Sequence, residues 1–367
     1  MEIETTTPST SKAFGPLAEM FKYDHEQVVF CQDKSTGLKA IIAIHDTTLG
    51  PSLGGTRMWK YASEEEALTD VLRLSRGMTY KSSVAGINLG GGKAVIIGDS
   101  HTEKNEALFR RFGKFVDSLN GKYISAEDVG VSPKDIEYMH METEHVTGIP
   151  EYLGGSGDPS PVTAYGVYMG IKASAKKAFG TDSLEGKKVL VQGVGSVGYY
   201  LCELLYKENA IITVTDIYKP SIKKVVDAFK VNVIDPKKVY TADMDIYAPC
   251  ALGATINDIT LNQLKCSVIA GGANNQLANE TIHGQALKEN GFLYAPDYVI
   301  NSGGIINCYW ELQGYNREAA ISQTEQIYDT TMRIFEKAEA ENLPTYLAAN
   351  KMAEERIRAI GKIQVSF

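Results

Sequence analysis

Short runs of apolar and β-branched residues at 27–31 and 38–45 predict two strands near the start of the chain. The turn-forming residues Ser35-Thr36-Gly37 lie between them, so we expect a β-hairpin. From Ser63 the apolar residues recur at helical spacing behind a Ser-Glu-Glu-Glu capping sequence, which predicts a helix over 63–81. The first dozen residues, rich in Thr and Ser, are expected to form a frayed tail.

A run of three glycines precedes the next group of elements. We expect Gly90-Gly91-Gly92 to form a turn that leads into a buried strand at 93–98, with Lys93 at the start of this strand. A helix at 106–119 and a strand at 123–126 follow, and this strand ends in the acidic pair Glu127-Asp128. Together these elements form a first predicted domain over residues 1–150.

The second half of the chain alternates between strands and helices. A segment dense in Gly, Pro and Ser at 154–161 is typical of a linker, so we place the domain boundary near it. Strands are predicted at 188–192, 211–216, 245–248, 268–270 and 292–294, and helices at 162–179, 197–208, 221–229, 319–341 and 345–360. This alternation is typical of a parallel sheet, which predicts an α/β fold with a second domain over 151–342. We expect the last helices, about 343–367, to pack back on the first domain.

Composition narrows the classes of function. A chain of 367 residues is long enough for two domains with a cleft between them. The net charge of -8 and the pI of about 5.4 argue against a nucleic-acid or anionic-membrane surface. The five cysteines and six histidines lack the spacing of a disulfide framework or a metal site. The acidic N-terminus and the short apolar runs indicate neither a signal peptide nor a membrane span, so we expect a cytoplasmic protein.

The strongest motif is G-x-G-x-x-G, formed by Gly193-Val194-Gly195-Ser196-Val197-Gly198 between a predicted strand and a predicted helix. In dinucleotide-binding folds the first glycine makes a tight turn, the second admits the pyrophosphate and the third lets the helix pack closely. Asp216 ends the next predicted strand, where a carboxylate bonds the ribose hydroxyls and repels a 2′-phosphate. We therefore predict NAD as cofactor. The alternative is a tight strand-helix turn that holds no ligand.

Three ionisable residues of the first domain are candidates for the chemistry, which a dinucleotide motif does not specify. Lys81 ends a predicted helix, Lys93 follows the three glycines and Asp128 closes a predicted strand. A desolvated lysine with a lowered pKa would serve as a base near neutral pH. Each residue also has a purely structural interpretation, as a cation at a helix C-terminus, an edge residue and a turn former respectively.

Five segments of the chain resemble a known family. They are TTLGPSLGGTRM at 47–58, GMTYK at 77–81, NLGGGK at 88–93, AEDVG at 126–130 and PCALGA at 249–254. These segments resemble the branched-chain and aromatic amino-acid dehydrogenases of the wider glutamate dehydrogenase superfamily. The resemblance runs from about residue 24 to residue 360, and it is greatest to the leucine-type members.

The resemblance implies oxidative deamination of L-leucine, and also of valine and isoleucine, to the 2-oxo acid and ammonium, with NAD reduced, and the reverse amination. Lys81 would bind the substrate carboxylate, Lys93 would activate water and Asp128 would exchange the proton of the amino group. Asn301 would also bind the substrate. The resemblance further implies cofactor contacts from Cys250, Ala251, Asn274 and Asn275. Plain turn residues are the alternative for Asn275 and Asn301.

The resemblance also implies a mostly apolar pocket for the substrate side chain. Its lining would be Leu53, Gly54, Gly55, Met78, Ala126, Thr147, Ile305 and Cys308. No cation is available there for a second carboxylate, so glutamate is disfavoured. Gly92 and Cys308 depart from the leucine-type pattern and Gly92 is typical of phenylalanine-type members, which leaves phenylalanine as an alternative substrate. One methylene changes binding by only about 1–3 kcal/mol, so several branched side chains should be accepted.

The family implies an N-terminal substrate and oligomerisation domain, a C-terminal Rossmann-type domain and a homo-octamer. Two other interpretations stay open. A hydroxy-acid dehydrogenase would share the cofactor fold, but it needs a histidine base paired with a carboxylate, and no histidine here has that context. An NAD-binding sensor without catalysis would leave Lys81, Lys93 and Asp128 without a task. For an enzyme, we expect the two domains to close during hydride transfer, because water must be excluded.

Overall fold

A five-stranded sheet forms the framework of the N-terminal half of the computed structural model, which describes residues 15–251 and 253–364. Its strands are β1 (Gln27–Asp33), β2 (Leu38–Asp46), β3 (Ser52–Trp59), β4 (Gly90–Ile97) and β5 (Tyr123–Glu127). Their order in the sheet is β1-β2-β4-β3-β5. The predicted hairpin of β1 and β2 is confirmed, β2 and β4 are antiparallel, and β3 pairs in parallel with both β4 and β5.

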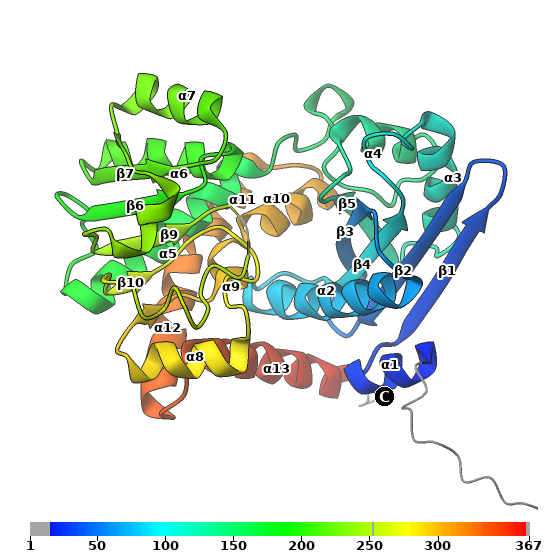
Figure 1. Cartoon of the computed structure of the whole chain (residues 1–367). Helices are drawn as coiled ribbons and strands as arrows, with labels where there is room; N and C mark the ends of the chain where they lie inside the picture. Colours follow the sequence, from blue (N-terminus) through cyan, green and yellow to red (C-terminus); the bar gives the residue numbers. More distant parts are fainter. Residues whose placement is uncertain (1–14, 252, 365–367) are drawn as a thin grey trace, which may run out of the picture.

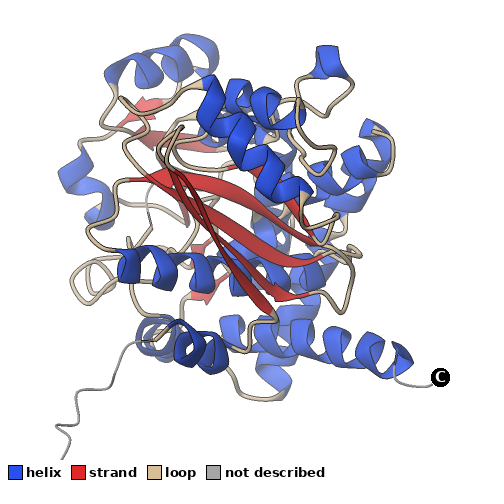
Figure 2. Ribbon diagram, turned by 90° about the vertical axis from the view of Figure 1, so that its right-hand side faces the viewer, coloured by secondary structure: helices blue, strands red, loops and turns tan. Residues whose placement is uncertain are grey.

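Helices cover both faces of this sheet (Figure 2). α2 (Glu64–Val84) begins after Ser63, whose side chain accepts a hydrogen bond from the backbone N–H of Glu66. Ile41 of β2 belongs to the apolar cluster that α2 covers, whereas the next residue, Ile42, packs in the cluster of α3 (Glu106–Asp117) and α4 (Pro133–His140). This alternation is the period-two pattern of a sheet buried on both sides. A short helix, α1 (Pro16–Tyr23), precedes β1.

The three glycines at 90–92 lie inside β4, so the predicted turn is wrong. The prediction that Lys93 starts a strand is wrong for the same reason, since Lys93 lies in the middle of β4. Glycine is required here by close packing. A Cβ on Gly91 would lie 2.1 Å from Oγ1 of Thr79 in α2, and a Cβ on Gly92 would lie 2.7 Å from the ring of Tyr123 in β5.

A six-stranded sheet forms the second half of the chain (Figure 1). Its strands are β6 (Lys188–Gln192), β7 (Ile211–Thr215), β8 (Asn232–Val233), β9 (Ile246–Pro249), β10 (Val268–Ile269) and β11 (Leu293–Tyr294). Their order is β11-β10-β9-β6-β7-β8, and every neighbouring pair is parallel. If β6 is taken as the first strand, the order read from β8 to β11 is 3-2-1-4-5-6, which is the strand order of a doubly wound dinucleotide-binding fold. The predicted α/β fold is confirmed.

Helices lie before, between and after the strands of this sheet. The helices are α5 (Ser160–Phe179), α6 (Ser196–Lys207), α7 (Lys219–Phe229), α8 (Glu280–Glu289), α9 (Asp297–Ile300), α10 (Gly303–Leu312), α11 (Arg317–Glu325) and α12 (Ile327–Ala340), with single 3₁₀ segments η1 (Glu151–Leu153) and η2 (Pro236–Thr241). The prediction of one helix over 319–341 is wrong, because the helix is interrupted at Gln326, between α11 and α12. The N–H of Gln326 bonds the carbonyl of Gln323, which is a tighter 3₁₀ turn.

The last helix, α13 (Thr345–Gln364), returns to the N-terminal half and lies along α2 (Figure 1). The hydroxyl of Ser83 donates to the carbonyl of Ala353 at 2.8 Å, and the hydroxyl of Tyr80 donates to Glu354 at 2.9 Å. Arg356 donates to the carbonyl of Ile87 at 2.9 Å. The far end of the sequence therefore braces the helix that carries Lys81. The domain bounds 1–150 and 151–342 stay a prediction.

Several elements were not predicted, and β3 is the most important of them. Its glycines, Gly54 and Gly55, weaken any strand pattern in the sequence, because glycine is unfavourable inside strands. The predicted N-terminal tail falls on residues outside the described part of the chain. Among the helices that the structure describes, none combines the length and the apolar character needed to cross a membrane.

Candidate active site

Lys93 of β4 and Asp128, directly after β5, form an ion pair with 3.1 Å between Nζ and Oδ2. The two strands are not neighbours, since β3 runs between them. Gly55 of β3 makes the contact possible, because a Cβ at this position would lie 2.9 Å from Cβ of Asp128. Lys93 is only 5% exposed. The structure thus brings together the predicted base and the predicted carboxylate.

Burial and charge shift the pKa of both partners. Burial favours the neutral acid at Asp128, but the charges of Lys93 and Arg57 hold the pKa of Asp128 down to about 2. Burial lowers the pKa of Lys93 against the attraction of Asp128, and the charge of Arg57 lowers it further. Asp128 is therefore a carboxylate at neutral pH, while Lys93 loses its proton more readily than an exposed lysine.

Arg57 of β3 is a site residue that the sequence analysis passed over. Its Nε donates to Oδ2 of Asp128 at 2.7 Å, and its NH1 donates to Oδ2 of Asp70 at 3.0 Å. The hydroxyl of Tyr61 donates to the same oxygen of Asp70 at 2.7 Å. The signal available in the sequence was an arginine between Thr56 and Met58, in a segment already noted for its resemblance to the family.

Lys81, near the end of α2, joins the two halves of the molecule. Its Nζ donates to Oδ1 of Asn274, which follows β10, at 3.5 Å. The side-chain amide of Asn301 donates to the same Oδ1 at 2.6 Å. Desolvation by the surrounding protein lowers the pKa of Lys81 to about 8, Asp297 opposes this shift, and the charge of Lys93 adds to it. Lys81 and Lys93 therefore belong to one electrostatic site at the junction of the two halves.

Asn275 and Asn301 differ in their surroundings. Asn275 is exposed and adopts the left-handed conformation at φ 53°, which suits a turn residue. Asn301 is 5% exposed, and within the described residues its Oδ1 is buried without a hydrogen-bond donor. Because a buried polar atom is normally paired, this oxygen is suited to a donor from a ligand.

The residues predicted for the side-chain pocket lie close to this junction. Leu53, Ile305 and Cys308 belong to one apolar cluster, and Met78 packs against it. In the N-terminal sheet, Gly54 and Gly55 of β3 face Ser125 and Ala126 of β5 in the register. The N–H of Thr147 donates to the carbonyl of Ser125, and its side chain contacts Cys308. Burial raises the pKa of the Cys308 thiol to about 12, so the pocket is uncharged at this residue.

The glycine motif has the local geometry of a dinucleotide turn. Gly193 is left-handed at φ 99°, and a Cβ there would lie 2.6 Å from Cβ of Ala251. A Cβ on Gly198 would lie 2.1 Å from the carbonyl oxygen of Gly193. At Gly195 an added Cβ would meet no heavy atom within 4 Å. The first and third glycines are thus required by packing, whereas the second leaves open space beside the backbone, as a pyrophosphate requires.

Asp216, Cys250 and Ala251, which are also predicted for the cofactor, lie beside this turn. Asp216 follows β7, and its Oδ2 accepts a hydrogen bond from the N–H of Val194 at 2.8 Å. α6 begins at Ser196, so its N-terminus points its free N–H groups toward the motif. Val197 would be 3.0 Å from a Cβ on Gly272, whose N–H donates to the thiol of Cys250 at 3.4 Å. The residues present therefore fit a dinucleotide.

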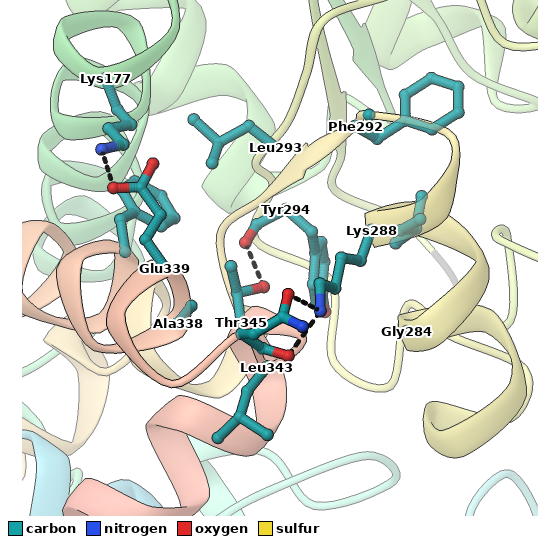
Figure 3. Close-up of a pocket in the computed structure, with 14 residues that line it drawn as sticks. Lys177, Gly284, Lys288, Phe292, Leu293, Tyr294, Ala338, Glu339, Leu343 and Thr345 are labelled. Carbon is teal, nitrogen blue, oxygen red and sulfur yellow. Dashed lines mark hydrogen bonds and ion pairs between the residues drawn. The ribbon is translucent and has the colours of Figure 1, made fainter.

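A separate cavity of about 370 Å³ lies between α5, α8 and α12 (Figure 3). None of the residues that line it belongs to the site described above. Its two cations already have partners: Lys177 pairs with Glu339 at 2.7 Å, and Lys288 donates to the side chain of Asn342 at 2.7 Å. The junction, and not this cavity, is therefore the candidate active site.

Comparison with known proteins agrees with the family resemblance seen in the sequence. Residues 25–145 match the family described as Glu/Leu/Phe/Val dehydrogenase, dimerisation domain, and residues 154–219 and 217–363 match Glutamate/Leucine/Phenylalanine/Valine dehydrogenase. The leucine dehydrogenase of Geobacillus stearothermophilus is 59% identical over 95% of this chain and 96% of its own. The phenylalanine dehydrogenase of Bacillus thermotolerans is 49% identical over 92% of this chain and 90% of its own.

Solved structures extend this agreement to the fold. The crystal structure of L-tryptophan dehydrogenase from Nostoc punctiforme superposes with a TM-score of 0.83 at 46% identity, and covers 94% of this chain and 99% of its own. The family matches span most of the sequence, and the ordered segments that first suggested the family lie within them. The chain belongs to the glutamate, leucine, phenylalanine and valine dehydrogenase family.

Proposed function

We propose that the protein catalyses the reversible, NAD-dependent oxidative deamination of L-leucine, and also of valine and isoleucine, to the 2-oxo acid and ammonium. The observation that carries this proposal is the meeting of Lys81, Lys93 and Asp128 in one electrostatic site beside the dinucleotide half. The 59% identity to leucine dehydrogenases over nearly the entire chain supports leucine as the substrate.

NAD is the cofactor in this proposal. The carboxylate of Asp216, at the end of β7 and beside the glycine turn, supports NAD over NADP, because a second negative charge would be repelled there. When bound, the nicotinamide accepts the hydride from Cα of the amino acid. Asn274, Asn275, Cys250 and Ala251 lie on the loops after β9 and β10, and we assign them to the cofactor.

Substrate binding rests on one cation and one buried amide. Lys81 binds the substrate carboxylate, which fixes Cα in place for hydride transfer. Asn301 offers its buried Oδ1 to a donor of the bound ligands, for which the substrate ammonium is suitable. Both groups lie at the contact between the two halves, so closure of the domains would exclude water from the substrate.

Lys93 and Asp128 carry the proton transfers. Loss of hydride leaves an iminium carbon, to which water adds while neutral Lys93 accepts a proton from the water. The carbinolamine then collapses: its hydroxyl proton leaves to solvent, and its nitrogen regains the proton that Asp128 took from the substrate ammonium before hydride transfer. The C–N bond breaks and ammonia departs, which becomes ammonium by taking up a proton from water. Asp128 exchanges the proton of the nitrogen. Lys93 and Arg57 both bind Oδ2 of Asp128, and within the described residues no donor binds Oδ1.

The apolar pocket favours a branched aliphatic side chain. Leu53, Met78 and Ile305 supply apolar surface, and the Cys308 thiol is neutral. Phenylalanine is the second candidate, because a phenylalanine dehydrogenase is 49% identical to this chain.

The test compares kcat/KM with NAD for leucine, valine, isoleucine and phenylalanine. We expect leucine to be preferred over phenylalanine, and turnover to be nearly abolished in Lys93→Ala and in Asp128→Asn. Lys223→Ala and Asp227→Asn are matched controls, because this pair lies on the exposed face of α7 with 2.5 Å between its charges. Normal turnover in Lys93→Ala and Asp128→Asn would contradict the proposal. A higher kcat/KM for phenylalanine than for leucine would identify phenylalanine as the substrate instead.

The proposal includes a homo-octamer in the cytoplasm. The family description of residues 25–145 as a dimerisation domain supports an oligomer. All five cysteines are free thiols, which supports a reducing compartment. Multi-angle light scattering should give a mass eight times the 40.1 kDa of the chain, and a smaller multiple would correct the octamer.

A further inference from the structure

Arg57 connects the Lys93–Asp128 pair to a second carboxylate on α2. Its guanidinium donates through Nε to Asp128 and through NH1 to Asp70, with 2.7 Å and 3.0 Å between the atoms. Lys93 lies 3.1 Å from the same Oδ2 of Asp128 that Arg57 binds. Tyr61 completes the chain by donating to Asp70. The contacts thus run from Lys93 of β4 to Asp128 after β5, then to Arg57 of β3 and to Asp70 of α2, and end at Tyr61, which lies between β3 and α2.

We infer that Arg57 is a positioning residue for the reaction: it fixes the carboxylate of Asp128 through Oδ2 and, by sharing that oxygen with Lys93, keeps Lys93 able to lose its proton. The inference rests on the proposed roles of Lys93 and Asp128. Without Arg57, the whole charge of Asp128 would act on Lys93 and hold the ammonium form.

The charges around Lys93 act in both directions. Asp128 after β5 and Asp70 of α2 favour the protonated lysine, whereas Arg57 of β3 favours the neutral amine. Lys81 of α2 also lies within electrostatic reach of Lys93. Tyr61 and Tyr123 stay neutral, because burial raises the pKa of both phenols. Arg57 therefore opposes the effect of Asp128 on Lys93, and it also contacts Asp128 directly.

The geometry requires a planar fork. Arginine can direct two N–H groups to two separate carboxylates, whereas lysine offers a compact point charge at the end of a flexible chain. Asp70, which itself accepts a hydrogen bond from Tyr61, binds NH1 of Arg57, so Nε is directed at Oδ2 of Asp128. As a result Oδ1 is left for the reacting nitrogen.

The experiment measures kcat/KM against pH for leucine deamination in Arg57→Met, Arg57→Lys and the parent. Deamination rises as Lys93 loses its proton, so the ascending limb reports Lys93 in the free enzyme. We expect Arg57→Met to shift this limb to higher pH by about one unit or more and to lower kcat by about 100-fold. Arg57→Lys should keep the limb within about 0.5 units of the parent, because the charge is kept, but lower kcat by about tenfold, because the fork is lost.

Arg110→Met is the matched control. Arg110 also binds two carboxylates, Glu106 and Glu142, but it lies on the exposed side of α3, so neither the limb nor kcat should change. An ascending limb of Arg57→Met at the parental pH would overturn the inference, whatever the loss in kcat. If circular dichroism shows that Arg57→Met does not fold, Arg57→Lys decides: parental kcat would overturn the need for the fork.

The failure of this inference differs from the failure of the proposed function. If Lys93→Ala and Asp128→Asn keep normal turnover, the proposed roles themselves are wrong. If those variants are inactive while the limb of Arg57→Met is unmoved, only the role of Arg57 is wrong.

Discussion

The carbonyl of Gly92 occupies the space in which a side chain on Gly54 would lie. A Cβ on Gly54 would be 1.7 Å from the Gly92 oxygen and 2.5 Å from its carbonyl carbon. The carbonyl of Gly54 in turn accepts a hydrogen bond from the hydroxyl of Tyr123 at 2.6 Å. The backbone position of Lys93, the residue after Gly92, therefore depends on a missing side chain in the neighbouring strand.

Gly54→Ala should destabilise the protein by at least about 3 kcal/mol, because the atoms in the way are backbone and cannot move aside. Urea unfolding measures this change. Gly77→Ala is the control, since Gly77 is an exposed residue of α2 whose added Cβ would meet nothing within 4 Å. The control should gain about 1 kcal/mol from helix propensity. Parental stability of Gly54→Ala would show that β3 can move away from β4.

The same glycines show where sequence patterns fail. The strands and helices from residue 188 to residue 229 were predicted well, because each element there is formed by its own local apolar pattern, whereas β8, α8 and α10 were not predicted. The run Gly90 to Gly92 was misjudged, because glycine marks either a turn or a close packing contact, and the contacts with Thr79 and Tyr123 are distant in sequence.

The candidate site was likewise predictable from the sequence only in part. Lys93 and Asp128 could be named from their motifs, but their pairing across β3 follows from Gly55, which only the register of three strands reveals. Arg57 was missed because its role depends on two partners, one of them on α2. The order of strands in the first sheet was equally beyond local pattern, since it depends on long-range pairing.

Lys81 should make binding of the 2-oxo acid weaken at alkaline pH. Its pKa is lowered to about 8, so its charge is present below this pH and lost above it. A 2-oxo acid has no amino group that titrates in this range, which makes it a cleaner probe than leucine. We expect the Kd of 4-methyl-2-oxopentanoate, measured with NADH bound, to rise by up to about tenfold per pH unit above pH 8.

Lys81→Met should bind the 2-oxo acid weakly, with the Kd nearly constant from pH 7 to pH 9. Lys223→Met, an exposed lysine of α7, should retain the parental pH dependence. A parental Kd profile in Lys81→Met would remove Lys81 from the carboxylate site.

Asp216 should control the choice between NAD and NADP. Its carboxylate accepts N–H bonds from Val194 and from Tyr218, each at 2.8 Å, at the mouth of the glycine turn. Asp216→Ala should raise the KM for NAD by about tenfold or more, because a charged acceptor is lost. The ratio of kcat/KM for NADP to that for NAD should increase, because the repulsion of the 2′-phosphate is also lost. An unchanged ratio in Asp216→Ala, with Asp227→Asn as the surface control, would argue against this role.

Two buried histidines between β2 and α2 should take up protons when the protein unfolds in acid. Nδ1 of His45 lies 2.8 Å from the hydroxyl of Thr79, and Nε2 of His25 lies 2.8 Å from that of Ser75. Burial lowers the pKa of each histidine from 6.5 to about 4. Because the folded pKa is depressed, their neutral forms stabilise the fold above pH 6.5, and this contribution is lost as the pH falls toward 4.

Glu127 acts in the opposite direction over the same range. Burial, with Asp158 and Asp135 nearby, raises the pKa of Glu127 from 4.5 to about 7, so folding takes up a proton there and unfolding releases it. At pH 5.5 the two histidines and Glu127 together should therefore take up about one proton on unfolding. A pH-stat measurement during urea unfolding gives the total uptake, and differences between variants cancel all other groups. Glu127→Gln should raise the uptake by about one proton, and His45→Asn should lower it by about one. Equal uptake in the parent and both variants would show that neither group changes its pKa on folding.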